Sequence, residues 1–155
     1  MSEDVGQLQQ LLRVRATERH RCERSLRAAL ERHDEAAGVL DTLVRDLVAN
    51  TAECERARKV RMTLPADPAV SDYCRAIETT LAELRCRQEA AQSRLDAAVQ
   101  ALTAARKRRM RVEQWLEVIE GRLREAQMRE RKRHQSRRDD DQAVQYSRDL
   151  CEMPL

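Results

Sequence analysis

Apolar side chains recur at alternating steps of four and three residues along two long stretches of this chain, which a short proline-containing segment separates. An average repeat of 3.5 residues keeps one apolar stripe facing a partner helix only when the helices supercoil. Each stretch is therefore expected to form a coiled-coil helix with one apolar seam. The seam of the first stretch is Leu8, Leu12, Arg15, Arg19, Cys22, Leu26, Ala29, His33, Ala36, Leu40, Leu43, Leu47, Asn50, Cys54, Ala57 and Arg61. That of the second is Val70, Cys74, Ile77, Leu81, Leu84, Gln88, Ala91, Leu95, Ala98, Leu102, Ala105, Arg109, Val112, Leu116, Ile119, Leu123 and Ala126.

The segment between the two stretches contains the signals that end one helix and start another. Pro65 disfavours helical geometry in the residue before it and removes a backbone donor, at a cost of about 3 kcal/mol in a helix interior. Asp67 is a good helix cap, and Pro68 suits the first helical turn, where an N–H is not needed. We therefore predict one helix over residues 3–62 and a second from 68 to about 138.

The two seams also predict how the helices pair. When paired residues are chosen so that their numbers add to 131, Cys54 lies opposite Ile77 and Leu12 lies opposite Ile119. The apolar positions stay in phase over the whole length, which favours an intramolecular antiparallel hairpin. The predicted fold class is all-α, a long antiparallel two-helix coiled-coil hairpin, and two parallel arms in a homodimer are the alternative.

The hairpin is expected to occupy residues 1–138, with its turn at 63–68. Residues 139–155 follow as a C-terminal tail, which begins with the acidic residues Asp139, Asp140 and Asp141 and is expected to be flexible. The composition agrees with a narrow seam, because the 155 residues include no Phe and 37% of them are charged. Such a chain lacks the bulky apolar side chains that fill a wide core.

The sequence lacks the signals of secretion, of membrane insertion and of metal binding. The acidic N-terminal residues lead into an amphipathic pattern without the apolar segment of a signal peptide, and no apolar run approaches the ~18 residues that span a bilayer. We expect a cytoplasmic protein. The five cysteines show no Cys-x-x-Cys spacing, which disfavours a disulfide framework and a zinc site. No cofactor is expected.

The sequence carries no arrangement typical of an enzyme. Its three glycines are isolated within helical pattern, so no phosphate-binding loop is present, and its three histidines show no metalloprotease spacing. A two-helix hairpin also offers no enclosed pocket that would perturb the pKa of a carboxylate. We therefore expect no enzyme, with no catalytic, cofactor-binding or metal-binding residues and no small-molecule substrate.

Two sets of side chains are candidates for binding other proteins. Apolar side chains near the turn form the first set, because they gather where the hairpin presents its tip; they are Met62, Leu64 and Tyr73. The second set belongs to the terminal arms, where two seam arginines fall close to a tryptophan and a basic stretch follows; its members are Arg15, Arg19, Trp115, Arg122, Arg129, Arg131 and Lys132.

Parts of both arms resemble a known family. The stretch from Leu11 to Arg15 with the Arg-, Glu- and Ala-rich residues after it is similar to the N-terminal arm of the type III secretion stalk proteins, the YscO/HrpO group related to flagellar FliJ. The basic run at residues 106–109, Trp115 with Leu116, and the charged stretch ending in Asp141 resemble their C-terminal arm.

The resemblance implies a non-enzymatic stalk of an export apparatus. Its partners would be the hexameric export ATPase, the export gate protein of the inner membrane and export chaperones, and its location would be cytoplasmic and peripheral to that apparatus. By position, the paired arms correspond to the end that faces the ATPase and the turn to the end that faces the gate.

Two other functions remain open. The first is a generic structural or chaperone-like coiled coil that has no ATPase partner. The second is a basic coiled-coil protein that binds nucleic acid through residues 122–138, and the scarcity of aromatic side chains for base stacking disfavours it.

Overall fold

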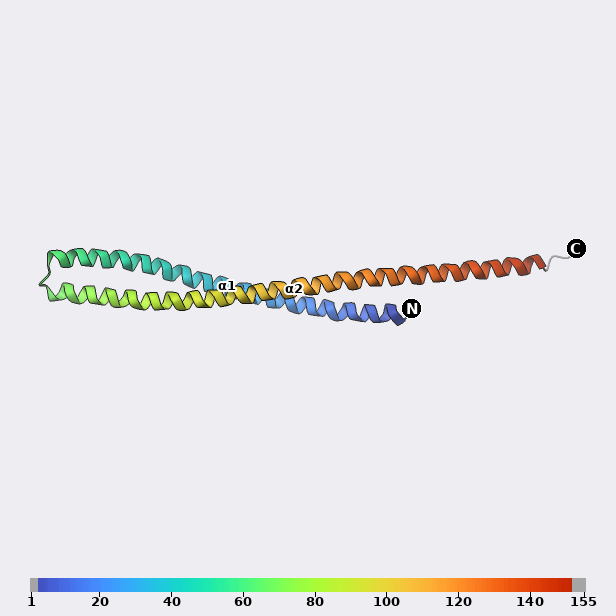
Figure 1. Cartoon of the computed structure of the whole chain (residues 1–155), viewed down its shortest axis with the longest axis horizontal. Helices are drawn as coiled ribbons and strands as arrows, with labels where there is room; N and C mark the ends of the chain where they lie inside the picture. The colour runs from blue at the N-terminus through green and yellow to red at the C-terminus, as the bar shows by residue number, and fades with distance from the viewer. Residues whose placement is uncertain (1–2, 152–155) are drawn as a thin grey trace. The chain divides into compact units, whose positions relative to one another are not determined.

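Two α-helices make up the part of the chain that the structure, a computed structural model, describes, residues 3–151. Helix α1 spans Glu3–Thr63 and α2 spans Pro68–Cys151, with no strand among the described residues (Figure 1). The helices run antiparallel and pack against each other. This confirms the predicted all-α antiparallel hairpin, and the break lies where Pro65 and Pro68 place it.

The turn is closed by the capping chemistry that its sequence predicts. The N–H of Leu64 donates to the Val60 carbonyl at 3.0 Å as the last bond of α1, and the N–H of Asp67 donates to the Leu64 carbonyl at 3.4 Å. The Asp67 carboxylate accepts from the N–H of Ala69 at 2.9 Å, which satisfies a donor left free at the start of α2. The four-residue connection therefore reverses the chain and caps the start of α2.

The end of α2 differs from the expectation. The helix continues to Cys151, whereas we expected it to stop near residue 138. The segment 139–151 contains neither Gly nor Pro, so nothing in it ends a helix, and loss of the apolar repeat alone does not do so. The rest of the expected tail, residues 152–155, lies outside the described residues.

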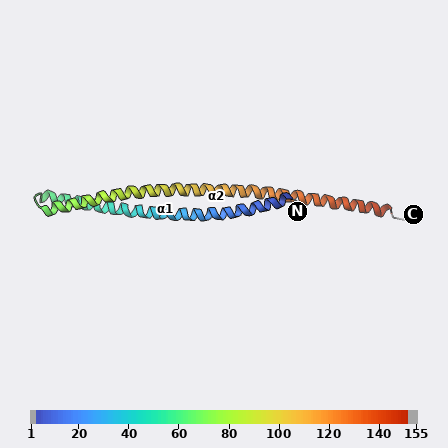
Figure 2. The same cartoon turned by 90° about the horizontal axis from the view of Figure 1, so that it is seen from below.

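The hairpin divides into two compact units that share the two helices. The turn unit comprises Arg24–Lys107, and the terminal unit comprises the residues up to Glu23 together with those from Arg108 onward. Within the turn unit, α1 and α2 lie side by side in both views (Figures 1 and 2). Each unit is thus a pair of antiparallel helical segments.

The core of the turn unit follows the predicted register. One buried cluster surrounds Cys54 and Ile77, and in it the Cys74 thiol donates to the Ala57 carbonyl at 3.5 Å. A second cluster joins Ala29 to two buried residues of α2. The numbers of the paired residues add to 131 in both clusters, as the seam predicts. The clusters contain Cys54, Ala57, Cys74, Ile77 and Leu81 in the first and Ala29, Leu102 and Ala105 in the second.

The terminal unit buries the same seam, with one residue that the sequence analysis omitted. Val5 is 2% exposed and lies three residues before Leu8, the first seam position that we assigned. The register pairs Val5 with Ala126, which is also buried. The seam therefore begins one step earlier than expected. The other buried residues of this unit are Val112, Leu116 and Ile119.

Burial along the seam of the turn unit is uneven. Near the turn, Ile77, Leu81 and Leu84 are each less than a tenth exposed. Farther along the same unit, Leu43 and Leu95 are only half-buried, although they occupy equivalent seam positions. Two helices cover a seam from only two directions, so the middle of the turn unit keeps apolar surface open to its sides.

We expect truncation of Leu81 to destabilise the hairpin. Leu81→Ala removes buried methyl groups and leaves a cavity in the seam, and should lower the free energy of unfolding by about 2 kcal/mol or more. Val48→Ala, at an exposed valine of the same unit, should change it by less than about 0.5 kcal/mol. Urea denaturation followed by circular dichroism measures both, and equal effects would show that the register is wrong.

Replacing Gly38 with Ala should have the opposite effect. Gly38 lies inside α1, and a Cβ added there meets nothing within 4 Å. Because alanine is the better helix former, Gly38→Ala should raise the free energy of unfolding by about 1 kcal/mol. The same denaturation measurement applies, and a loss of stability would mean that the neighbouring side chains lie closer than the structure places them.

Candidate interaction surfaces

All three predicted side chains at the turn are exposed to solvent, Tyr73 to 50%. Met62 is 83% exposed and Leu64 is 52% exposed. The Tyr73 hydroxyl also donates to the carboxylate of Glu53 on the other helix. Tyr73 also lines a shallow hollow of about 300 Å³ with Val60 and other residues, and neither Met62 nor Leu64 lines that hollow. Of the three predicted residues, Tyr73 alone lines this hollow.

Tyr73 and Glu53 change each other's acidity. The hydrogen bond from Tyr73, reinforced by the nearby Arg56 guanidinium, holds the pKa of Glu53 below its ordinary value of 4.5. The same hydrogen bond raises the pKa of Tyr73 above its ordinary value of 10.0, and partial desolvation adds to this. The bond needs an ionised Glu53 and a protonated Tyr73. Its contribution to stability is lost as pH falls through the folded pKa of Glu53 and as pH rises through that of Tyr73.

A spectroscopic titration tests this pair. In a Tyr146→Phe background, which leaves Tyr73 as the single tyrosine, the additional change Glu53→Gln should lower the pKa of Tyr73, because a neutral amide holds the phenol proton less strongly than a carboxylate does. Absorbance near 295 nm reports phenolate formation. An unchanged midpoint in Glu53→Gln would show that the two side chains do not interact in solution.

In the terminal unit, Arg15 and Trp115 lie together across the two helices. The Arg15 guanidinium carbon is 5.8 Å from the centroid of the Trp115 ring, within cation–π distance, and an Arg15 nitrogen lies 2.5 Å from Glu18. Trp115 is 55% exposed. The clustering of Arg15 with Trp115 that the sequence predicts is thus present, and part of the ring remains open to a partner.

Arg19 has a different environment from Arg15. Its Nε lies 3.8 Å from a Glu23 oxygen, too far for a hydrogen bond, and has no hydrogen-bond partner although the atom is buried. The Glu23 carboxylate also lies 3.4 Å from His20. Both seam arginines therefore pair with acidic residues of α1. Arg15 also contacts Trp115 on the opposite helix.

The predicted basic residues of α2 fall into two groups. Arg122 and Arg129 line a hollow of about 470 Å³ together with the start of α1, where Leu11 is 49% exposed. Arg131 and Lys132 are exposed beyond this hollow and make no ion pair with another described residue. Sequence reasoning did not select Leu11 as a binding residue, although its place beside the seam residue Leu12 was a usable signal.

Residues 131–147 form a single helix without a packing partner, which we call the α2 extension. All of its side chains are exposed, and the register leaves it without a described residue of α1 opposite (Figure 1). Five Arg and Lys residues occupy its first half, and Asp139, Asp140 and Asp141 follow them. The α2 extension therefore offers neighbouring positive and negative patches, and few apolar groups, to a partner.

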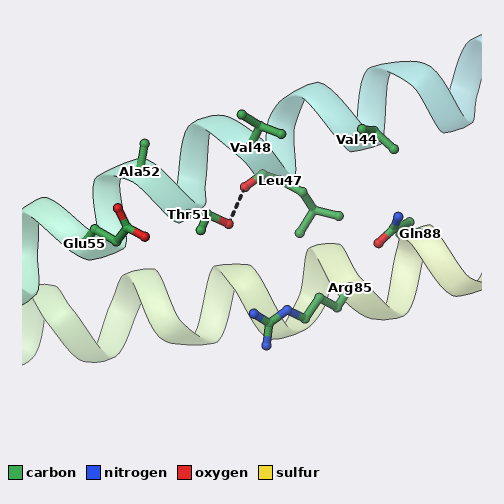
Figure 3. Close-up of a pocket in the computed structure, with 8 residues that line it drawn as sticks. All are labelled: Val44, Leu47, Val48, Thr51, Ala52, Glu55, Arg85 and Gln88. Carbon is green, nitrogen blue, oxygen red and sulfur yellow. Dashed lines mark hydrogen bonds between the residues drawn. The ribbon is translucent and has the colours of Figure 1, made fainter.

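The turn unit also carries open grooves on both sides of its seam, which sequence reasoning missed. Figure 3 shows one of them, of about 520 Å³, where Leu47 points toward α2 and the Thr51 hydroxyl donates to the Leu47 carbonyl at 2.7 Å. Val48 also lines this groove and is 66% exposed. The usable signal was a second apolar row on α1 next to the seam.

The remaining chemistry of the described residues is limited. No group of three or more His, Cys, Asp or Glu side chains within the described residues is arranged to hold a metal ion. Neither helix has, in its described part, a stretch apolar enough to cross a membrane. No family model, curated protein or solved structure matches this chain.

Proposed function

We propose that this chain is a non-enzymatic stalk of a type III secretion apparatus, located in the cytoplasm at the periphery of the inner-membrane export machinery. In this role it binds the hexameric export ATPase and the export gate protein, with export chaperones as further partners. The observation that carries the proposal is the combination of a two-helix hairpin with an unpaired basic helix, the first half of the α2 extension. The resemblance of both arms to the stalk family supports it.

The terminal unit carries the surface that we assign to the ATPase. Arg122 and Arg129 line one hollow, and Arg131 and Lys132 continue the positive surface along α2. Exposed guanidinium and ammonium groups attract an acidic partner surface, and salt screens that attraction. Trp115, half-exposed under the Arg15 guanidinium, adds an amphipathic contact of the kind that is enriched at interfaces.

The turn carries the surface that we assign to the export gate. Met62 and Leu64 are exposed and apolar, while Tyr73 is held against α1 by Glu53. A rigidly held tyrosine contributes contact area at low cost in conformational entropy, which suits an interface.

A structural or chaperone-like coiled coil without an ATPase partner is the second candidate. The open grooves of the turn unit favour it, because they offer apolar surface to other helices and have no part in the ATPase contact.

Charge reversal separates the two proposed surfaces. The triple variant Arg129→Glu, Arg131→Glu and Lys132→Glu should weaken binding to the cognate hexameric ATPase by more than about 1 kcal/mol, roughly five-fold or more, because single exposed charges contribute less than that. Tyr73→Ala should leave ATPase binding intact and weaken binding to the export gate protein. Titration of labelled chain with each partner gives both affinities.

A matched control is a triple reversal of exposed arginines on α1. Their changes alter the net charge equally but lie outside the assigned surface; they are Arg13, Arg21 and Arg24. If both triple variants lose ATPase binding equally, the change in net charge alone explains the loss, and the assigned surface is wrong. If the native chain binds no export ATPase, the stalk function is wrong. DNA affinity that falls steeply with salt would then favour the nucleic-acid function.

A further inference from the structure

Two adjoining hollows on one side of the turn unit form a continuous groove between α1 and α2. Their volumes are about 830 and 470 Å³, and the residues that line both are Glu35, Val39, Ala91 and Arg94. This groove and the groove in Figure 3 lie on opposite sides of the seam. On α1, this groove is lined by residues one position before a seam residue, such as Val39 before Leu40, whereas the groove in Figure 3 is lined by residues one position after, such as Val48 after Leu47. We call it the arginine-rimmed groove.

The floor of the arginine-rimmed groove is apolar and open. Val39 is 52% exposed, and the seam residue Leu43 beside it is only half-buried. The facing wall on α2 consists largely of alanines, including Ala98, whose short side chains leave room for larger ones. The groove therefore keeps apolar surface that neither helix covers.

The lining residues are spaced for contact with a helix. On α1 they include positions 32, 35, 39 and 42, and on α2 positions 87, 90, 94, 97 and 101. Alternating steps of three and four place each row along one face of its helix, as in the holes that receive the side chains of a third coiled-coil helix. The α2 row is about 20 Å long at 1.5 Å per residue, which corresponds to about four helical turns.

Positive charge borders the floor. Arg32, Arg87 and Arg94 line the groove, and none of them makes a hydrogen bond or ion pair with another described residue. Glu35 is the one carboxylate among the lining residues. By contrast, the groove of Figure 3 has one arginine, Arg85, and one glutamate among its lining residues.

We propose that the arginine-rimmed groove binds an amphipathic α-helix of another protein, whose apolar stripe fills the floor and whose flanking Asp or Glu side chains pair with the three arginines. Helix-in-groove binding of this kind is a common mode of peptide recognition. The backbone groups of α1 and α2 are satisfied within each helix here, so an extended peptide would find no edge to pair with. The inference is independent of the ATPase contact.

A second copy of this chain is a poor occupant of the groove. In a two-fold dimer the same surface meets itself, so Arg32, Arg87 and Arg94 of one copy would approach the same three arginines of the other. Like charges brought together on an interface oppose association. The occupant that fits is therefore a helix with the opposite charge pattern.

Designed peptides test the proposal on the full chain. One probe is a labelled helical peptide of about four turns with Leu at alternating steps of three and four and Glu at the flanking positions; the control peptide has Lys in place of each Glu. Fluorescence anisotropy at low salt should show the Glu peptide binding roughly ten-fold or more tightly than the Lys peptide. Equal affinities would overturn the proposal.

Variants of the chain locate the binding. Arg87→Glu combined with Arg94→Glu should reverse the preference, so that the Lys peptide binds more tightly than the Glu peptide. Arg85→Glu, in the other groove, should preserve the native preference. Val39→Glu should abolish binding, whereas Val48→Glu, at an exposed valine of the other groove, should not.

Two further outcomes would contradict the proposal. Loss of peptide binding in Val48→Glu as large as in Val39→Glu would place the peptide elsewhere. Sedimentation that shows a dimer of the native chain, lost in Val39→Glu, would identify a second copy as the occupant. Circular dichroism checks that each variant keeps its helicity. If Val39→Glu loses its helicity, the test rests on whether the double variant Arg87→Glu, Arg94→Glu prefers the Lys peptide.

Discussion

The apolar seam between α1 and α2 is the constraint on which this molecule depends. Each helix contributes one narrow row, and the buried members are mostly Ala, Cys, Val, Ile and Leu. No single side chain dominates such a seam, because the chain has no Phe and its Trp115 lies outside it. Stability is therefore spread over many small contacts. A slip of one residue would rotate a row by about 100° and replace seam residues with charged ones.

The interaction surfaces follow from the same constraint. Two helices cover a shared seam from two directions and leave its flanks open, so apolar grooves on either side belong to the fold itself. Their chemistry is then set by the flanking residues. Arg32, Arg87 and Arg94 make one groove of the turn unit positive, whereas Glu55 and Arg85 make the other mixed in charge. One seam thus presents two grooves that differ in charge.

Most of the fold could be predicted from the sequence because it depends on periodicity and on local signals. The repeat predicts both helices and their register, and Asp67 with Pro68 predicts the start of α2. The end of α2 was missed because the apolar repeat reports a packing partner, and a helix does not need one to continue. Val5 was missed because the assigned repeat started at Leu8, one step too late.

The candidate sites were less predictable, because they depend on contacts between residues distant in the sequence. The position of Tyr73 near the turn was visible, but its bond to Glu53, twenty residues away, was not. The Arg15–Trp115 pair could be predicted because both positions lie close together in the register. Predicting the grooves would require knowing which seam residues are only half-buried. The apolar repeat does not show this, because it marks all seam positions alike.

The α2 extension has a consequence for the local stability of the molecule. Residues 131–147 contact no second helix, so their order rests on hydrogen bonds within one turn and the next, and isolated helices of this length are marginal in water. Opening of these residues exposes no buried surface and leaves the seam intact. The backbone amides of the extension are therefore expected to exchange their protons through frequent local fraying, while amides beside Ile77 and Leu81 should exchange only when the seam itself opens.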